Sequence, residues 1–238
     1  MEQAFTFDAI AMIAPLTTLD YIAVGFFWVS WWLVGRIIES SQTRHPSTTA
    51  LMRSYRMDWL RHVITRDPRV FDAMITVSMR DGTAFFASAC MIAIGGGLAL
   101  VGNTEHLTLI AEDLSLDAIP AVVWELKILV ILLMVTMAFL NFVWSHRVFG
   151  YCSVMMGAIP NDHDDPLALI RAEKAAKLNI TAARAFNRGL RSVYFALGGL
   201  AWLVGAAPLI IATLMTLYVI LRREYWSNTR SILLEPEE

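Results

Sequence analysis

The placement of lysine and arginine constrains this chain more than any other feature. All 19 basic residues lie outside three stretches, 1–35, 81–126 and 192–221. These stretches also hold most of the longest apolar runs, and lysine and arginine are depleted in segments that enter a lipid bilayer. With 57% hydrophobic and 17% charged residues, the 238-residue chain has too few charges for an ordinary soluble domain. The sequence therefore predicts an all-α, polytopic membrane helical bundle that forms a single domain.

Hydrophobic length places the crossings, because one transmembrane helix needs about 20 apolar residues. On this basis we expect five spans, at about 19–36, 82–102, 118–143, 193–205 and 208–221. The last two spans are short. The segment 205–208 between them, Gly-Ala-Ala-Pro, fits either a tight turn or a kink within one longer helix.

The charges of the connecting segments predict the orientation. The N-terminal segment and the segment 103–117 carry acids without a base, whereas the links between spans one and two and between spans three and four are rich in arginine. The positive-inside rule then places the N-terminus outside. Five crossings bring the basic tail from Arg222 onward inside, whereas four would leave it outside. Because residues 1–18 lack a basic segment, we expect no cleavable signal peptide.

The predicted inner segments also contain helix signals. Asp67-Pro68 and Asp165-Pro166 each place an N-cap residue before a proline suited to the first helical position. We expect a long helix after each pair, the first reaching Gly102 and the second running directly into the fourth span.

An amphipathic cytoplasmic helix is predicted at about 47–64. Its apolar residues fall on one helical face: Leu51, Met52, Tyr55, Trp59 and Val63. Such a helix either binds anionic lipid headgroups or docks against the cytoplasmic ends of the other helices, and we favour docking.

Four stretches resemble a known family. They are 72–100 (DAMITVSMRDGTAFFASACMIAIGGGLAL), 144–160 (WSHRVFGYCSVMMGAIP), 186–202 (FNRGLRSVYFALGGLAW) and 221–227 (LRREYWS). They are similar to domain-of-unknown-function family 599 (DUF599), which comprises uncharacterised bacterial and plant membrane proteins. The resemblance implies a shared architecture but no activity, cofactor or site. With the predicted orientation, it leads us to expect a multi-pass protein of the bacterial inner (plasma) membrane.

Lys127 is the first candidate functional residue, because it lies inside the third predicted span with Glu125 close by. An ionisable residue inside a membrane is a functional candidate by default. The alternative is that Lys127 reaches the outer interface and pairs with a carboxylate for structural reasons.

A second group of candidates lies at the predicted inner ends of the spans. It consists of Arg80, Asn141, Arg147, Asn187, Arg188 and Arg191. If the helices are neighbours, the guanidinium groups line one positively charged vestibule, and arginine suits phosphate or carboxylate ligands. This interpretation is an anion or anionic-lipid site. The alternative is positive-inside anchoring with ion pairs between helices.

Small residues predict how the helices associate. Gly95-Gly96-Gly97 and Gly198-Gly199 allow close approach of helices, so we expect packing faces and a homo-oligomer. The sharper alternative is a locally unwound helix that exposes carbonyl groups to an ion, as in many transporters.

Other chemistry has little support in the sequence. The acidic segment 161–165 fits a solvated loop with a helix cap better than a cation site, so we expect no metal. Cys90 falls within the second span and Cys152 near the inner end of the third, and this placement predicts no disulfide. No phosphate-binding glycine loop or nucleophile elbow is present, so we expect no enzyme, no cofactor and no nucleic-acid partner.

Two classes of function remain. The first is an oligomeric channel or transporter for a small anionic solute, with Lys127 and the inner arginines at the two ends of its path. The second is a non-catalytic membrane scaffold or assembly partner that binds anionic membrane lipid or a cytosolic protein. Polar groups at both predicted membrane faces favour the first.

Overall fold

The computed structural model describes residues 16–40, 45–102 and 120–236. The described residues form helices and no strand, which confirms the all-α prediction. The helices are α2 (Thr18–Glu39), α3 (Thr48–His62), α4 (Val70–Val101), α6 (Ala121–Gly157), α7 (Pro166–Gly199), α8 (Ala206–Tyr225) and α9 (Asn228–Leu233). Two 3-10 segments, η1 (Val63–Thr65) and η2 (Leu200–Leu203), follow α3 and α7. The acidic segment 103–117 and the acids before residue 16 lie outside the described residues.

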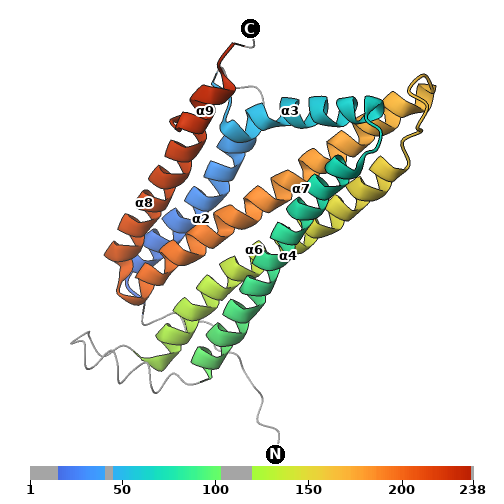
Figure 1. The fold of residues 1–238 in the computed structure, drawn as a ribbon. Coiled ribbons are helices and arrows are strands. Elements are labelled where there is room, and N and C mark those ends of the chain that lie inside the picture. The colour runs from blue at the N-terminus through green and yellow to red at the C-terminus, as the bar shows by residue number, and fades with distance from the viewer. Residues whose placement is uncertain (1–15, 41–44, 103–119, 237–238) are drawn as a thin grey trace, which may run out of the picture.

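The long helices alternate in direction along the bundle (Figure 1). α2, α6 and α8 run toward the end of the molecule where α3 crosses, and α4 and α7 run away from it. α6 packs most extensively against α7 and α4, and α2 packs against α8. We call the end where α3 crosses the α3 end and the other the distal end. The described termini, at residues 16 and 236, therefore lie at opposite ends of the bundle.

Among the described residues, four helical segments are long and apolar enough to cross a membrane. They are Thr18–Glu39, Val70–Val101, Ala121–Gly157 and Ala206–Leu233. The predicted fourth span, 193–205, corresponds to the last part of α7 and to η2, as expected for a helix that continues from Pro166. A turn at Gly205 then reverses the chain into α8. The number of crossings and the orientation remain predictions.

One of the two predicted helix starts is confirmed and the other is wrong. Asp165 caps α7, where its carboxylate accepts a hydrogen bond from the Leu167 amide at 2.7 Å and Pro166 occupies the first turn. Asp67 does not cap a helix, because α4 begins only at Val70, after Arg69. The guanidinium of Arg69 instead donates to two carbonyl groups just after α6, which holds this turn against that helix.

The predicted amphipathic segment forms α3 and η1, and it docks on the bundle. Ser47 caps α3, and the helix packs against α7, α2, α8 and α9. Its most buried residues are Leu60 and Val63, both with 0% exposure, so Leu60 belongs to the apolar face although the prediction omitted it. Tyr55 of the predicted face is exposed.

The projecting ends of α6 and α7 explain why α3 has a surface to dock on. α6 has 37 residues, which corresponds to about 55 Å at about 1.5 Å per residue, far more than a hydrocarbon core of about 30 Å. Alanines on α7 let this helix approach α6 closely, and α3 covers the resulting apolar cluster. Cys152 belongs to this cluster and, like Cys90, is a free thiol, as predicted.

Candidate functional site

The charged residues of the two ends of α2 form two separate clusters. Asp20 and Glu39 lie near the ends of this 22-residue helix. Their separation along the helix axis is about 28 Å at about 1.5 Å per residue, close to the thickness of a bilayer hydrocarbon core. The two clusters are therefore spaced as two membrane interfaces are spaced.

At the α3 end, two arginines from α7 hold the carboxylate of Glu39. Arg188 donates from Nε to Oε1 at 2.8 Å and from Nη2 to Oε2 at 2.5 Å. Arg191 donates from Nη2 to Oε1 of the same carboxylate. The Arg191 side chain is 8% exposed, whereas that of Arg188 is 52% exposed. We call these three residues the Glu39 cluster.

The Glu39 cluster lines an open cavity of about 480 Å³. The remaining wall comes from α2 and from Asn141 on α6. Arg36 also lines it and stacks its guanidinium 4.7 Å from the ring centre of Trp32, which is half exposed. With three guanidinium groups and one carboxylate, the cavity wall carries a positive charge. Such a wall can bind a small anion by charge-assisted hydrogen bonds.

The structure brings together only part of the vestibule predicted from the sequence. Arg188, Arg191 and Asn141 line the same cavity. Asn187 lines a different one, between α3, α7 and α8. Arg147 is exposed on α6, where its Nε donates to the Tyr151 hydroxyl at 2.6 Å, four residues further along the helix.

Arg80 lies in the first half of α4 rather than beside the Glu39 cluster. Its carbonyl oxygen accepts the Thr83 hydroxyl at 2.6 Å and lies 3.3 Å from Nδ1 of His146 on α6. The Nε atom of Arg80 is buried without a hydrogen-bond partner among the described residues. Arg80 and Arg147 therefore line neither of the two cavities.

Glu39 is the functional candidate that the sequence interpretation missed. The sequence does contain a feature that could have identified it, because Glu39 is an acid at the predicted inner end of the first span, near the basic link that follows. Only the pairing of α2 with α7 identifies it, since Glu39 and Arg188 are 149 residues apart in the chain.

At the distal end, Lys127 is enclosed. It is 4% exposed, and its ammonium lies 5.6 Å from the ring centre of Trp124 and 5.8 Å from that of Trp202. The Trp202 indole donates to Oδ1 of Asp20 at 2.8 Å, which places the carboxylate beside the ammonium. We call Asp20, Trp124, Lys127 and Trp202 the Lys127 cluster. Glu125, the other predicted member, is half-buried on α6.

Asp20 is also fixed by the start of its own helix. Thr17 and Asp20 form a reciprocal capping box, and Oδ2 accepts both the Thr17 amide at 3.1 Å and its hydroxyl at 2.6 Å. Hydrogen bonds to a carboxylate and a nearby ammonium are what a buried charged pair needs. The Asp20 carboxylate is thus enclosed and hydrogen-bonded, unlike the carboxylate in the open cavity at the α3 end. Among the described residues, Nε1 of Trp124 is buried without a hydrogen-bond partner.

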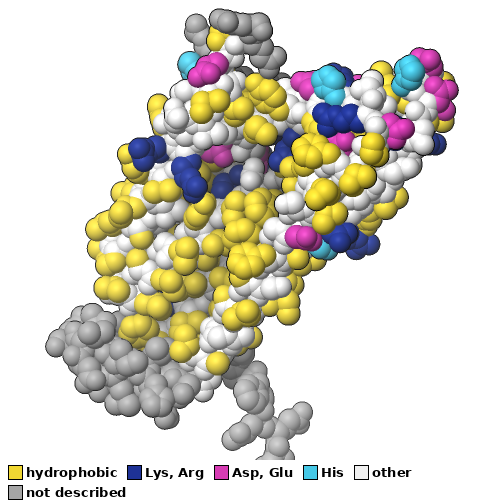
Figure 2. Space-filling view, in the orientation of Figure 1, with side chains coloured by type: hydrophobic (Ala, Val, Ile, Leu, Met, Phe, Trp, Pro, Cys, Tyr) yellow, Lys and Arg dark blue, Asp and Glu magenta, His cyan; other side chains and the backbone are white. Residues whose placement is uncertain are grey.

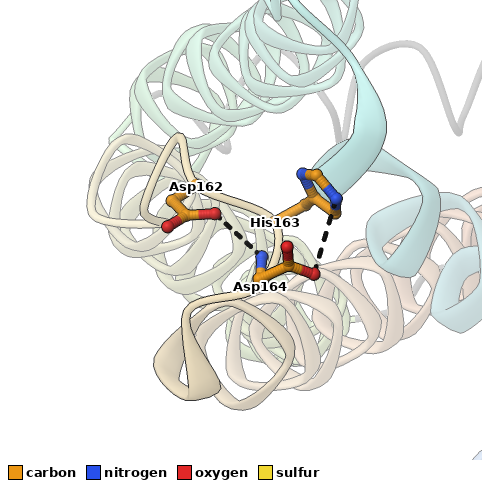
Figure 3. A group of neighbouring side chains, drawn as sticks. All are labelled: Asp162, His163 and Asp164. Atoms are coloured by element: carbon orange, nitrogen blue, oxygen red, sulfur yellow. Dashed lines mark hydrogen bonds and ion pairs between the residues drawn. The ribbon is translucent and has the colours of Figure 1, made fainter.

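The acidic loop after α6 is exposed to solvent. Asp162, His163 and Asp164 lie together and are all exposed (Figure 3). The Asp162 carboxylate accepts the Asp164 amide at 3.0 Å, and His163 lies 3.5 Å from the Asp164 carboxylate. These contacts form a turn that leads to the Asp165 cap.

The distribution of side chains over the surface fits a membrane protein. On the face drawn in Figure 2, charged side chains gather toward the α3 end, and hydrophobic side chains cover much of the described surface toward the distal end. Together with the four apolar helices, this defines the class as a helical integral membrane protein.

The chain belongs to the family described as protein of unknown function, DUF599, which matches residues 22–229. This match covers most of the chain and confirms the resemblance seen in the sequence. Comparison with curated proteins and with solved structures gives no match.

Proposed function

We propose that this integral membrane protein transports a small anionic solute across the bacterial inner membrane, with the Glu39 cluster as its anion site. The observation that carries the proposal is the geometry of Glu39 in its open cavity. A carboxylate of the protein occupies the two guanidinium groups that an incoming anion would use. A solute anion can displace it, because Arg188 is half exposed to the cavity.

A transporter accounts for the two clusters better than an open channel does. Transport by alternating access requires one end to be closed while the other is open. The Glu39 cavity opens to the surface, whereas Lys127 is 4% exposed and enclosed by two indole rings. In the proposed orientation the N-terminus is outside, and the Glu39 cavity faces the cytoplasm.

One observation favours the second candidate, a membrane scaffold that binds anionic lipid. Trp32 is 53% exposed, and Arg36 stacks on its ring at the edge of the same cavity. Tryptophan and arginine are typical of the headgroup region, where a basic cluster attracts anionic lipid. The cavity would then hold a lipid headgroup without translocating it.

Self-association remains part of the proposal. Only 6% of the apolar part of α4 is buried within the chain. A Cβ atom added at Gly95 or Gly96 would meet nothing within 4 Å, whereas Gly97 packs on Leu132 within the same chain. The first two glycines therefore leave a smooth outer surface on α4 that suits either lipid or a second copy of the chain.

Flux into liposomes tests the transport proposal. Purified protein is reconstituted, and uptake of radioactive chloride, acetate and phosphate is compared for the native chain and for Arg188→Ala, Arg191→Gln and Arg222→Gln. We expect uptake of at least one anion, and a decrease of about tenfold or more in the first two variants, because each removes a charge-assisted hydrogen bond. Arg222 is the control, since it is exposed on α8 outside the cavity.

The outcomes separate the two candidates. Undiminished uptake in the Arg188 and Arg191 variants would remove these residues from the solute path. No uptake of any of these anions, combined with anionic lipid retained by the native protein and lost from the Arg191 variant, would favour the scaffold.

A further inference from the structure

A second cationic cavity lies between α3, α7 and α8. Its volume is about 300 Å³, and its polar wall includes Thr49, Arg53, Arg56, Arg184 and Glu224. α3 contributes the first three of these residues, α7 the fourth and α8 the last. The cavity is therefore formed only when α3 docks across the bundle.

The cavity has more positive charge than its own residues neutralise. Within the described part of the chain, no ion pair joins Arg53, Arg56 or Arg184 to a carboxylate. The Nε atom of Arg184 is buried without a hydrogen-bond partner there. Burial, together with the nearby guanidinium of Arg184, lowers the pKa of Arg53. Guanidinium groups nevertheless stay protonated in proteins, so the repulsion persists at neutral pH.

The surrounding structure holds these guanidinium groups in place. Arg53 donates from Nη2 to the Glu39 carbonyl at 2.9 Å, at the end of α2. Arg56 donates from Nη1 to Oδ1 of Asn179 on α7 at 2.5 Å. Both contacts use neutral oxygen atoms, so they position the side chains without pairing the charges, and the Glu39 carboxylate acts on Arg53 only from beyond ion-pair distance.

The one carboxylate in the wall is already engaged with α3. Glu224 accepts the Thr49 amide at 3.0 Å and the Thr49 hydroxyl at 2.8 Å. It thus sits at the N-terminus of a 15-residue helix, where the helix dipole favours an anion. With three guanidinium groups and one carboxylate, the cavity wall has a net charge of about +2, which a bound anion of about two negative charges would neutralise.

We propose that this cavity binds a phosphate group, either as inorganic phosphate or as the headgroup of a phosphomonoester lipid. Guanidinium groups form paired hydrogen bonds with phosphate oxygens, and a phosphate near its second ionisation carries about the charge that is missing. The site is separate from the Glu39 cavity. The two share a link, because Glu39 binds Arg53 through its carbonyl and Arg188 through its carboxylate.

Equilibrium binding to protein in phosphatidylcholine nanodiscs tests the proposal, with radioactive inorganic phosphate as the probe. We expect saturable binding that weakens about tenfold or more in Arg184→Gln. The variant Glu224→Gln should bind phosphate more tightly, because it removes the competing charge and keeps an oxygen that can accept from Thr49. A gain of affinity cannot result from misfolding. Arg222→Gln, on an exposed part of α8, should leave binding unchanged.

A competition experiment distinguishes the two sources of phosphate. Nanodiscs that contain phosphatidic acid are compared with nanodiscs of phosphatidylcholine alone. Loss of phosphate binding in the presence of phosphatidic acid assigns the site to a lipid headgroup, and unchanged binding assigns it to free phosphate. Equal phosphate affinity in the native, Arg184 and Glu224 forms, or no binding of either probe, would overturn the proposal. Neither result bears on flux through the Glu39 cavity, which the Arg191 variant tests separately.

Discussion

The two ends of α2 each hold a carboxylate close to basic side chains, but one carboxylate is enclosed and the other borders an open cavity. At the distal end, the carboxylate of Asp20 is surrounded by hydrogen-bond donors and by the ammonium of Lys127, and the group is closed. At the α3 end, the carboxylate of Glu39 pairs with two arginines beside an open cavity. A buried carboxylate held by several hydrogen bonds stabilises one arrangement, whereas an accessible ion pair can exchange partners. This difference is the basis for proposing an exchangeable anion site at the α3 end and a fixed structural group at the distal end.

The largest effect on stability should come from replacing each of the two acidic residues by alanine in turn. Asp20→Ala leaves the Lys127 ammonium buried without its counter-charge and removes the acceptor of Trp202. We expect a decrease of about 3–5 kcal/mol in the free energy of unfolding, because three donors lose their acceptor and the buried ammonium loses a nearby opposite charge. Thermal and denaturant unfolding in detergent would measure it. Glu39→Ala leaves Arg191, 8% exposed, without its carboxylate, but Arg188 is half exposed and the cavity is open to water, so we expect a smaller decrease.

A double variant checks the cause of the Asp20 effect. Asp20→Ala combined with Lys127→Met removes both charges, so the loss should be smaller than the sum of the two single losses. Additive losses would mean that Asp20 and Lys127 are not coupled, and equal losses for Asp20→Ala and Glu39→Ala would remove the contrast between the two ends.

Packing around α7 extends the comparison to the α3 end itself. In one turn of this helix, Gly189 borders a tightly packed core and Arg188 borders the open cavity. A Cβ atom at Gly189 would lie 2.7 Å from the Phe142 ring. That ring is fixed between Phe86, at 5.3 Å between ring centres, and Phe186, at 5.5 Å. Gly189→Ala should therefore decrease unfolding free energy by about 1–3 kcal/mol, as overpacking does.

Gly35 in the cavity wall provides the matched control. A Cβ atom there would meet only the Arg191 guanidinium, at 3.7 Å, an ordinary van der Waals contact. Gly35→Ala should leave stability unchanged or slightly raised, because alanine favours a helix more than glycine does. If both variants lost a comparable amount of unfolding free energy, the cavity wall at Gly35 would be as tightly packed as the core at Gly189, contrary to this interpretation.

Removal of the Glu39 charge should give the next largest effect, a change in anion affinity. Glu39→Gln removes the internal competitor but keeps an oxygen that can accept from Arg188. We expect an anion that uses the cavity to bind about tenfold more tightly, which corresponds to about 1.4 kcal/mol. The apparent affinity in the liposome uptake assay would report this change. Weaker binding would show that Glu39 assists the anion rather than competing with it.

The sequence predicts the helices of this protein better than its sites. The apolar composition of α2, α4, α6 and α8 is a local property, and so is the capping of α7 by Asp165. Arg188, Arg191 and Asn141 were placed correctly at one end because lysine and arginine mark that end. Whether two residues share a cavity depends instead on the rotation of each helix and on its neighbours, which no local pattern records.

Arg147 and Glu39 illustrate the two kinds of error. Arg147 turns away to stack on Tyr151, four residues along α6, a pairing that helical spacing makes available on any exposed face. Glu39 meets its arginine partners only through α7, across 149 residues of chain. Likewise, the cavity with Arg53 and Arg184 exists only because α3 folds back across the bundle. Tertiary contacts of this range are set by packing rather than by residue spacing.

The smallest predicted effect concerns the docking of α3, which forms part of the wall of the second cationic cavity. Arg61 donates from Nη2 to Oε1 of Glu173 on α7 at 2.7 Å, and this hydrogen bond, more than any other contact, lowers the pKa of Glu173. Because the pKa is lower in the folded state, the pair stabilises at neutral pH, and the contribution is lost as the pH falls through the lowered pKa. Glu173→Gln should therefore cause a small decrease in stability at pH 7 and none at strongly acidic pH. Unfolding curves at both pH values would measure this, and the same difference at both would assign the effect to packing of the side chain.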